Sequence, residues 1–208
     1  MNRYMDSRSI LSDPHLYKFF QDLVRGGDFY RFFSREHVKS EPGSRILDIG
    51  CGTADVLECL NGVEYVGFDM SKKYIDFCKR RFAGRGLFIC EKVSRNIMEN
   101  SAPFDTIMAN GILHHLDDDD FIQLLDLSQA LLKKGGRLIT YDGCYIDGQP
   151  WFEKYLLSKD RGKFVRSREG YLALIKKVFS NVHDTIYHDK FNVPYPLLII
   201  ECTPENDR

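Results

Sequence analysis

The sequence has 208 residues, of which 43% are hydrophobic and 28% charged, proportions that suit a single soluble globular domain. Its formal net charge of −1 gives no overall field toward nucleic acid or an anionic membrane, so we expect neither as a partner. The longest apolar runs are far too short to span a bilayer, no signal-peptide pattern is present, and six scattered cysteines lack a C-x-x-C pair, so we expect a cytoplasmic protein with reduced thiols.

Two amphipathic segments come first along the chain. They are "SDPHLYKFFQDLV" (residues 12–24) and "DFYRFFSREHV" (residues 28–38). Both carry aromatic residues at helical spacing, so we expect two helices that pack across the sheet or its edge.

Short β-rich runs then alternate with helical patterns. Strands are expected at Arg45–Ile49, Glu64–Phe68, Leu87–Cys90, Phe104–Ala109 and Arg137–Tyr141. This alternation is typical of a parallel sheet with helices on both faces. Two final strands, "NVHDTIYH" and "YPLLIIEC", are too close in sequence for a crossover helix and should pair antiparallel. The predicted fold is α/β, a Rossmann-like seven-stranded mixed sheet with one antiparallel strand.

Two of the expected helices carry clear boundary signals. In "SKKYIDFCKRRF" (residues 71–82), Ser71 is the expected N-cap. The helix "DDDDFIQLLDLSQALLKKGG" (residues 117–136) starts with acids at its positive end and should finish at Lys133, Lys134 and the glycine pair Gly135-Gly136. Capping therefore explains the four aspartates without a functional role.

The loop after the first strand, "DIGCGTAD" (residues 48–55), closes a strand and should open a helix. A dinucleotide fingerprint would need a third glycine at Asp55, where a carboxylate would instead repel a pyrophosphate. No G-K-[ST] follows, which excludes a Walker loop. Acids on both sides, Asp48 and Asp55, favour a positively charged or zwitterionic ligand without phosphate.

A second acid, Asp69, follows the second strand about twenty residues later, where a carboxylate can accept both hydroxyls of a ribose. Met70 offers an apolar surface to an adenine. Together with the backbone of Gly50, Cys51 and Gly52, these residues describe a pocket for S-adenosylmethionine. Asp48 would assist its ammonium group.

At this point the chain resembles the class I S-adenosylmethionine-dependent methyltransferases. Four motifs carry the resemblance in order: "ILDIGCGTAD", "YVGFDMS", "FDTIMANGILHHL" and "LLKKGGRLIT", over about residues 45 to 142. Ala54 stands where glycine is more common. The acid that often follows the third strand is also missing, so adenine recognition would rely on Ser94 or on backbone amides.

The ends of the chain are similar to those of a subgroup of small bacterial methyltransferases that act on small molecules. That resemblance implies N-terminal helices closing over the cofactor, with Tyr17, Gln21 and Arg25 as contacts and Arg25 paired with the methionine carboxylate. An amphipathic lid helix with a solvated Arg25 is the alternative.

Methyl transfer needs a base only if the acceptor atom carries a proton of high pKa. Asn110, after the fourth strand, should hold the methionine ammonium, and His114 and His115 follow it. One neutral imidazole, His115 by preference, would act as the base, unless the pair merely packs and hydrogen-bonds backbone. Asp142, at the end of the fifth strand, would pair with a histidine or the acceptor, or simply cap a loop.

The segment from Gly148 to Tyr171 should cover the acceptor. It carries Trp151 and the basic residues Lys159, Arg161, Lys163, Arg166 and Arg168, which indicate either an anionic acceptor or a solvated helix face. We divide the single domain into N-terminal lid helices (1–43), a cofactor-binding core (44–142), an acceptor-site cover (143–170) and the last helix with the terminal hairpin (171–208). No metal is expected, because Asp142 and Asp147 lack the further acids that a divalent ion would need.

The predicted function is therefore methyl transfer from S-adenosylmethionine to a small-molecule acceptor, preferably at oxygen, with anionic and sugar-type metabolites as the classes considered. The alternatives are methylation of protein or RNA and a non-catalytic S-adenosylmethionine-binding protein. The sequence leaves the oligomeric state open.

Overall fold

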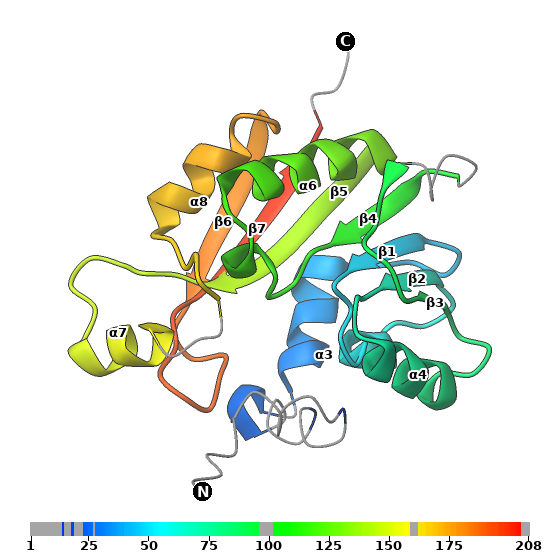
Figure 1. Cartoon of the computed structure of the whole chain (residues 1–208), viewed down its shortest axis with the longest axis horizontal. Coiled ribbons are helices and arrows are strands. Elements are labelled where there is room, and N and C mark those ends of the chain that lie inside the picture. The colour runs from blue at the N-terminus through cyan, green and yellow to red at the C-terminus, as the bar shows by residue number, and fades with distance from the viewer. Residues whose placement is uncertain are drawn as a thin grey trace, which may run out of the picture.

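A computed structural model describes residues 14, 18, 23–26, 28–95, 102–158 and 162–204, and Figure 1 shows the whole chain. Its core is one seven-stranded sheet in the order β3-β2-β1-β4-β5-β7-β6. The strands are β1 (Arg45–Ile49), β2 (Glu64–Phe68), β3 (Leu87–Ile89), β4 (Phe104–Met108), β5 (Leu132–Gly143), β6 (Asn181–Tyr187) and β7 (Leu197–Thr203).

Strands β1 to β5 pair in parallel, and β7 runs antiparallel to both of its neighbours, β5 and β6. The predicted Rossmann-like mixed sheet with one reversed strand is therefore confirmed. Both β1 and β2 have the predicted bounds. In the parallel register, Asp48 pairs with Gly67 of β2 and Met108 of β4, so the ends of three strands meet at one edge.

Helices cover both faces of the sheet (Figure 1). On one face the core contains side chains of α6 (Asp118–Leu131) and α8 (Arg168–Ile175). On the other it contains side chains of α3 (Phe29–Phe33) and α4 (Lys72–Arg81). The shorter elements are the π-helical turn η1 (Ser34–Val38), the 3-10 turns η2 (Asp55–Cys59) and η3 (Leu113–His115), and α7 (Trp151–Ser158). None of the described helices is long and apolar enough to cross a membrane.

Several predicted helices are present. Ser71 caps α4 as expected, because its Oγ accepts a hydrogen bond from the Tyr74 amide at 3.4 Å. The segment 28–38 forms α3 and η1, whereas most of the segment 12–24 lies outside the described residues. The last helix, α8, begins at Arg168, before the residue-171 boundary that we drew between cover and terminal unit.

The predicted C-terminus of the helix at 117–136 was wrong. Helix α6 ends at Leu131, and β5 begins at Leu132, which pairs with Phe104 of β4. The two glycines serve a strand irregularity there instead of a helix cap: Gly135 has φ +78°, and a Cβ on Gly136 would lie 2.8 Å from the Phe104 carbonyl oxygen. Such irregular strand positions favour glycine for the same conformational freedom that suits it to helix caps.

The loop after β1 opens a single 3-10 turn, η2, in place of the α-helix that we expected. Ala54 immediately before it has φ 52°, in the left-handed region that alanine adopts at a cost of about 1–2 kcal/mol. This conformation explains why glycine is the more usual residue there in the family that the loop resembles.

One buried histidine holds the N-terminal helical segment (α3 and η1) against strands β6 and β7. His37 Nδ1 lies 2.8 Å from Glu201 Oε1 of β7, and the Tyr187 hydroxyl of β6 lies 3.2 Å from His37 Nε2. Arg137 of β5 pairs with the other Glu201 oxygen at 3.6 Å. These contacts hold η1, and α3 before it, against the antiparallel part of the sheet.

Replacing Asp117 by alanine should lower the free energy of unfolding by about 1 kcal/mol, because its side chain caps α6 by accepting from the Asp120 amide at 2.9 Å. The matched control is Asp119→Ala in the same first turn, for which we expect a change within about 0.5 kcal/mol. Urea denaturation measures both. Equal losses would attribute the effect to charge near the helix end and not to the cap.

Candidate active site and cofactor pocket

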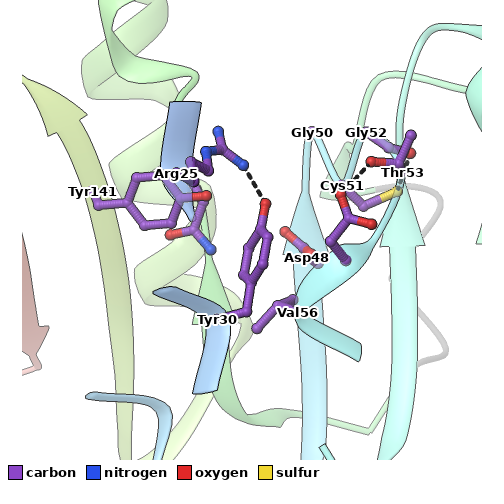
Figure 2. Close-up of a pocket in the computed structure, with 11 residues that line it drawn as sticks. Arg25, Tyr30, Asp48, Gly50, Cys51, Gly52, Thr53, Val56 and Tyr141 are labelled. Atoms are coloured by element: carbon purple, nitrogen blue, oxygen red, sulfur yellow. Dashed lines mark hydrogen bonds between the residues drawn. The ribbon is translucent and has the colours of Figure 1, made fainter. Parts of the chain in front are cut away.

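A pocket opens at the carboxyl ends of β1, β4 and β5, opposite the N-terminal helical segment (Figure 2). Its lining combines the loop after β1 with the side chains of Arg25, Tyr30 and Tyr141. The lining residues are Arg25, Tyr30, Asp48, Gly50, Cys51, Gly52, Thr53, Asp55, Val56, Asn110 and Tyr141. The structure thus brings together six of the eleven residues predicted to bind the cofactor.

The glycines let the loop fold tightly over the strand ends. Gly50 has φ +72°, and a Cβ there would lie 2.5 Å from the Ile112 side chain, so no other residue fits without rearrangement. The amides of Gly50 and Cys51 both donate to the Phe68 carbonyl of β2, at 2.8 and 2.9 Å. The Gly52 amide donates to Asp69 Oδ2 at 2.9 Å. The loop is therefore tied to the end of β2.

Asp48 is buried at the floor of the pocket, with 3% of its surface exposed. The Tyr65 hydroxyl of β2 donates to Asp48 Oδ2 at 2.5 Å. Burial raises the pKa of Asp48 to about 7, the negative charge of Asp69 adds to the rise, and the bond from Tyr65 opposes it. A cation placed beside Asp48 would recover the ionised form, as expected of a residue that assists an ammonium group.

The sequence indicated that Asp55 would favour a positively charged ligand, but its carboxylate has partners within the protein. Its carboxylate accepts from Arg81 of α4 and from the Thr53 hydroxyl, the latter at 2.6 Å, and Lys18 lies 3.4 Å away. Although burial acts in the opposite direction, these donors and charges lower the pKa of Asp55. Because Arg81 compensates Asp55, the negative charge available to a ligand at this loop comes from Asp48.

Arg25 forms the opposite wall with two tyrosines. It donates to the Tyr30 hydroxyl, and its guanidinium lies 5.4 Å from the centre of the Tyr141 ring (Figure 2). The Asn192 amide, in the β6–β7 loop, donates to the Val24 carbonyl at 2.8 Å and so holds the segment that carries Arg25. These contacts leave Arg25 half-buried, and its pairing with the methionine carboxylate stays a prediction.

Asn110 supplies the clearest sign that the pocket is built for a ligand. Its side-chain Oδ1 is buried and has no hydrogen-bond partner in the part of the chain that the structure describes. Leaving a buried carbonyl oxygen unpaired costs about 1–3 kcal/mol. An ammonium group in the pocket would satisfy this oxygen, which agrees with the role predicted for Asn110.

The other described residues predicted to contact the cofactor are not among those that line the pocket. Asp69 is half-buried and borders it through Gly52, and its other oxygen accepts from the Ser71 amide at 2.7 Å. Met70 is 77% exposed, beside Asp69. Ser94 is half-buried in the coil after β3 and is not part of the lining. Tyr17 and Gln21 lie outside the described residues.

The structure joins two of the three predicted catalytic residues. His114 Nδ1 lies 2.6 Å from Asp142 Oδ1, and the His114 amide donates to the same oxygen at 3.2 Å. Both side chains are buried, and Thr140 Oγ1 lies 3.0 Å from the second Asp142 oxygen. His115 is exposed, with its ring centre 4.2 Å from that of His114. Asp142 follows Tyr141, which lines the cofactor pocket.

Comparisons with known proteins agree with this geometry. Residues 46–136 match the family model described as "Methyltransferase domain". The solved structure of the plantazolicin methyltransferase BpumL, in complex with a triazolic desmethylPZN analogue and S-adenosylhomocysteine, superimposes with a TM-score of 0.64 at 18% identity, over 95% of this chain and 94% of that one. Residues 46–136 are therefore similar to known methyltransferase domains, and the chain shares the fold of this solved methyltransferase.

The curated relatives of this chain have names that point to different acceptors. "Probable tRNA methyltransferase 9B" of Homo sapiens is 29% identical over 56% of this chain, and phosphoethanolamine N-methyltransferase of Triticum aestivum is 26% identical over 72%. This chain spans 25% and 30% of their lengths, respectively. Both of these relatives are named as methyltransferases, so their names agree on the reaction but not on the acceptor.

The arginines that suggested an anionic acceptor have partners within the protein. Arg166 donates to Asp118 of α6 at 2.6 Å and to the Leu116 carbonyl at 2.9 Å. Arg168 forms a two-pronged pair with Asp184 of β6, at 2.6 and 2.9 Å. Lys159 and Arg161 lie outside the described residues, and Lys163 is exposed. The charges of Arg166 and Arg168 are therefore compensated within the protein.

Sequence reasoning missed Tyr30 and Tyr65 as site residues. Tyr65 had a usable signal: it stands in a predicted strand next to the one that ends in Asp48, and buried tyrosine hydroxyls need a partner. Tyr30 had none, because its approach to Arg25 depends on how the N-terminal segment turns onto the sheet.

Cofactor affinity should depend on pH through Asp48. With a pKa of about 7, Asp48 carries a proton below that pH in the free protein, and the proton must leave before the carboxylate can pair with an ammonium. Affinity for S-adenosylhomocysteine should therefore fall up to about tenfold for each pH unit below 7 and be level above it.

Calorimetry across this pH range, in buffers of different ionisation enthalpy, measures both the affinity and the proton released. Asp48→Asn should abolish the pH dependence. Other titratable groups near Asp48 are Tyr65, Cys51 and Asp69, and Tyr65→Phe should move the midpoint upward because it removes the bond that lowers the Asp48 pKa. A pH dependence that persists in Asp48→Asn would assign it to another group.

Proposed function

We propose that this protein transfers a methyl group from S-adenosylmethionine to a hydroxyl oxygen of a small-molecule acceptor, and that the His114–Asp142 pair removes the hydroxyl proton. The observation that carries the proposal is the buried 2.6 Å contact between His114 Nδ1 and Asp142 Oδ1 beside the cofactor pocket. A histidine oriented by a carboxylate is a recurring arrangement for proton removal from hydroxyl groups.

The proton path follows from this contact. With Asp142 accepting the Nδ1 proton, the imidazole of His114 is held in the tautomer whose Nε2 can accept a proton. When bound, the cofactor supplies a methyl group on a cationic sulfur. As the acceptor oxygen forms its bond to that methyl carbon and the carbon–sulfur bond breaks, the hydroxyl proton passes to His114 Nε2. Asp142 then stabilises the imidazolium.

The cofactor contacts in this proposal use the polar groups of the pocket. Asp48 and Asn110 would bind the ammonium group of the cofactor, and Arg25 its carboxylate. Asp69 would accept the ribose hydroxyls, with Met70 beside the adenine. The buried, unpaired Asn110 oxygen and the raised pKa of Asp48 support the first assignment.

Asp69→Ala should weaken binding of S-adenosylhomocysteine by about 10- to 100-fold, because it removes both the ribose acceptor and the partner of the Gly52 amide. Asp76→Ala is the matched control, since Asp76 belongs to the nearby α4 but pairs with Lys72 on the surface. Isothermal calorimetry measures both variants. Unchanged affinity in Asp69→Ala would remove Asp69 from the binding site.

The acceptor proposal is tested by measuring S-adenosylhomocysteine release over sugars, phosphosugars, phenols, carboxylic acids and a tRNA mixture. We expect the fastest turnover with a hydroxyl-bearing small molecule. The tRNA arm addresses the activity named for one curated relative, to which the net charge of −1 gives no support. Faster turnover of tRNA would contradict the proposal.

With the best acceptor, His114→Asn should lower kcat by roughly 10²- to 10⁴-fold with cofactor affinity almost unchanged, since it removes the base but leaves the pocket. His115→Asn is the matched control, because the two rings lie on the same turn and His115 is exposed. A larger loss in His115→Asn would assign the base to His115, the residue that the sequence favoured.

A further inference from the structure

Helix α7 has an unusual distribution of side chains. Its aromatic residues are turned outward, with Trp151 79% and Tyr155 55% exposed. The buried positions fall at a spacing of four residues: Gln149, just before the helix, then Glu153 and Leu157, with 6%, 9% and 1% exposed. An ordinary surface helix buries its apolar face and exposes its polar one. Two of these three buried positions are polar.

The two polar side chains carry atoms without partners. Glu153 Oε2 and Gln149 Nε2 are buried, and neither has a hydrogen-bond partner among the residues that the structure describes. The other end of the Gln149 amide is fixed, because its Oε1 accepts from the Ile146 amide at 3.2 Å. Burying a carboxylate oxygen without a partner is unfavourable unless a ligand compensates it. Among the described residues, the buried acceptor on Glu153 and the buried donor on Gln149 therefore lack partners, and they lie about one helical turn apart.

Contacts made by α7 and by the chain after it link this part of the fold to the proposed base, His114, and to its partner Asp142. Leu157 packs on Gly143, where a Cβ would lie 2.7 Å from Leu157 Cδ2, and Gly143 directly follows Asp142. After α7, Gly162 packs so closely on the His114 ring that a Cβ would clash with it, and the Phe164 amide donates to the His114 carbonyl at 2.9 Å. Figure 1 shows α7 beyond the carboxyl end of β5, outside the layers that cover the sheet.

We propose that Gln149 and Glu153 bind the methyl acceptor and that the acceptor carries an amino group in addition to the hydroxyl that is methylated. The Glu153 carboxylate pairs with the protonated amine, and the Gln149 amide donates to an oxygen of the same molecule. This inference rests on the proposed function, because it places the acceptor beside the His114–Asp142 pair.

Charge decides between classes of acceptor. A cation compensates a buried carboxylate better than a neutral hydroxyl does, and an acidic acceptor would be repelled by it. Arg166 and Arg168, which would have favoured an anion, are paired with Asp118 and Asp184. The described part of the segment thus favours an amino alcohol or amino sugar over a phosphorylated or acidic metabolite.

The test uses two matched series of probes on protein saturated with S-adenosylhomocysteine. One series is glucosamine, glucose and glucuronate; the other is tyramine, tyrosol and 4-hydroxyphenylacetate. Within each series the ring is kept while the amine is exchanged for a hydroxyl or a carboxylate. We expect the amine of at least one series to bind about tenfold or more tightly than its partners by calorimetry.

Glu153→Gln should remove this preference, since the neutral amide cannot pair with the ammonium. Asp147→Asn is the matched control, because Asp147 is an exposed acid in the same segment, and it should keep the preference. Overturning results would be no binding by either amine, equal or tighter binding of a carboxylate, or an unchanged preference in Glu153→Gln.

A second measurement does not depend on the probes. Glu153→Gln should raise the unfolding temperature of the protein with S-adenosylhomocysteine bound, because it removes a buried charge that has no partner. A lowered unfolding temperature would overturn the proposal by showing that the carboxylate has a structural role. Failure of the wild-type protein to bind S-adenosylhomocysteine would instead contradict the cofactor assignment and the proposed function.

Discussion

The hydrogen bond from the Gly52 amide to the Asp69 carboxylate fixes the arrangement on which the site depends. It ties the loop after β1 to the residue that follows β2, and the amides of Gly50 and Cys51 reinforce the tie through the Phe68 carbonyl. With the loop held in this way, Asp48 stays at the floor of the pocket. The same carboxylate thus shapes the loop and stands where we place the ribose.

Two neighbouring residues at the end of β5, Tyr141 and Asp142, belong to different parts of the site. Successive residues of a strand point to opposite faces, so Tyr141 turns toward Phe29 and Arg25 while Asp142 turns toward His114. The cofactor wall and the proposed base therefore share one strand end. A shift of this strand by one residue would exchange the two side chains and lose both arrangements together.

The sequence predicted the features that depend on local pattern. Strands β1 and β2 are short runs rich in apolar residues, and their ends were correct to the residue. The boundary between α6 and β5 was wrong, because a glycine pair after a helical stretch fits a helix cap and a strand irregularity equally well. Local pattern does not distinguish two uses of the same conformational freedom.

Partners that are distant in sequence were harder to predict. The ion pair of Asp55 with Arg81 joins residues 26 positions apart, so Asp55 had seemed free to serve a ligand. The reverse holds for Glu153, whose burial is implied by its spacing of four residues from Leu157 but whose lack of a partner appears only once the chain is folded. A sequence names the charged residues of a site, whereas the fold decides which of them are already compensated.

The contact between His37 and Glu201 also bears on how the protein acquires its site during synthesis. The two residues are 164 positions apart. Their contact attaches the helical segment that contains Tyr30, and that follows Arg25, to β7. A ribosome adds about 5–20 residues each second, so β7 emerges many seconds after this segment. Throughout that interval the nascent chain has the glycine loop but no anchored opposite wall. Tight cofactor binding therefore has to wait for the last strand to join the sheet.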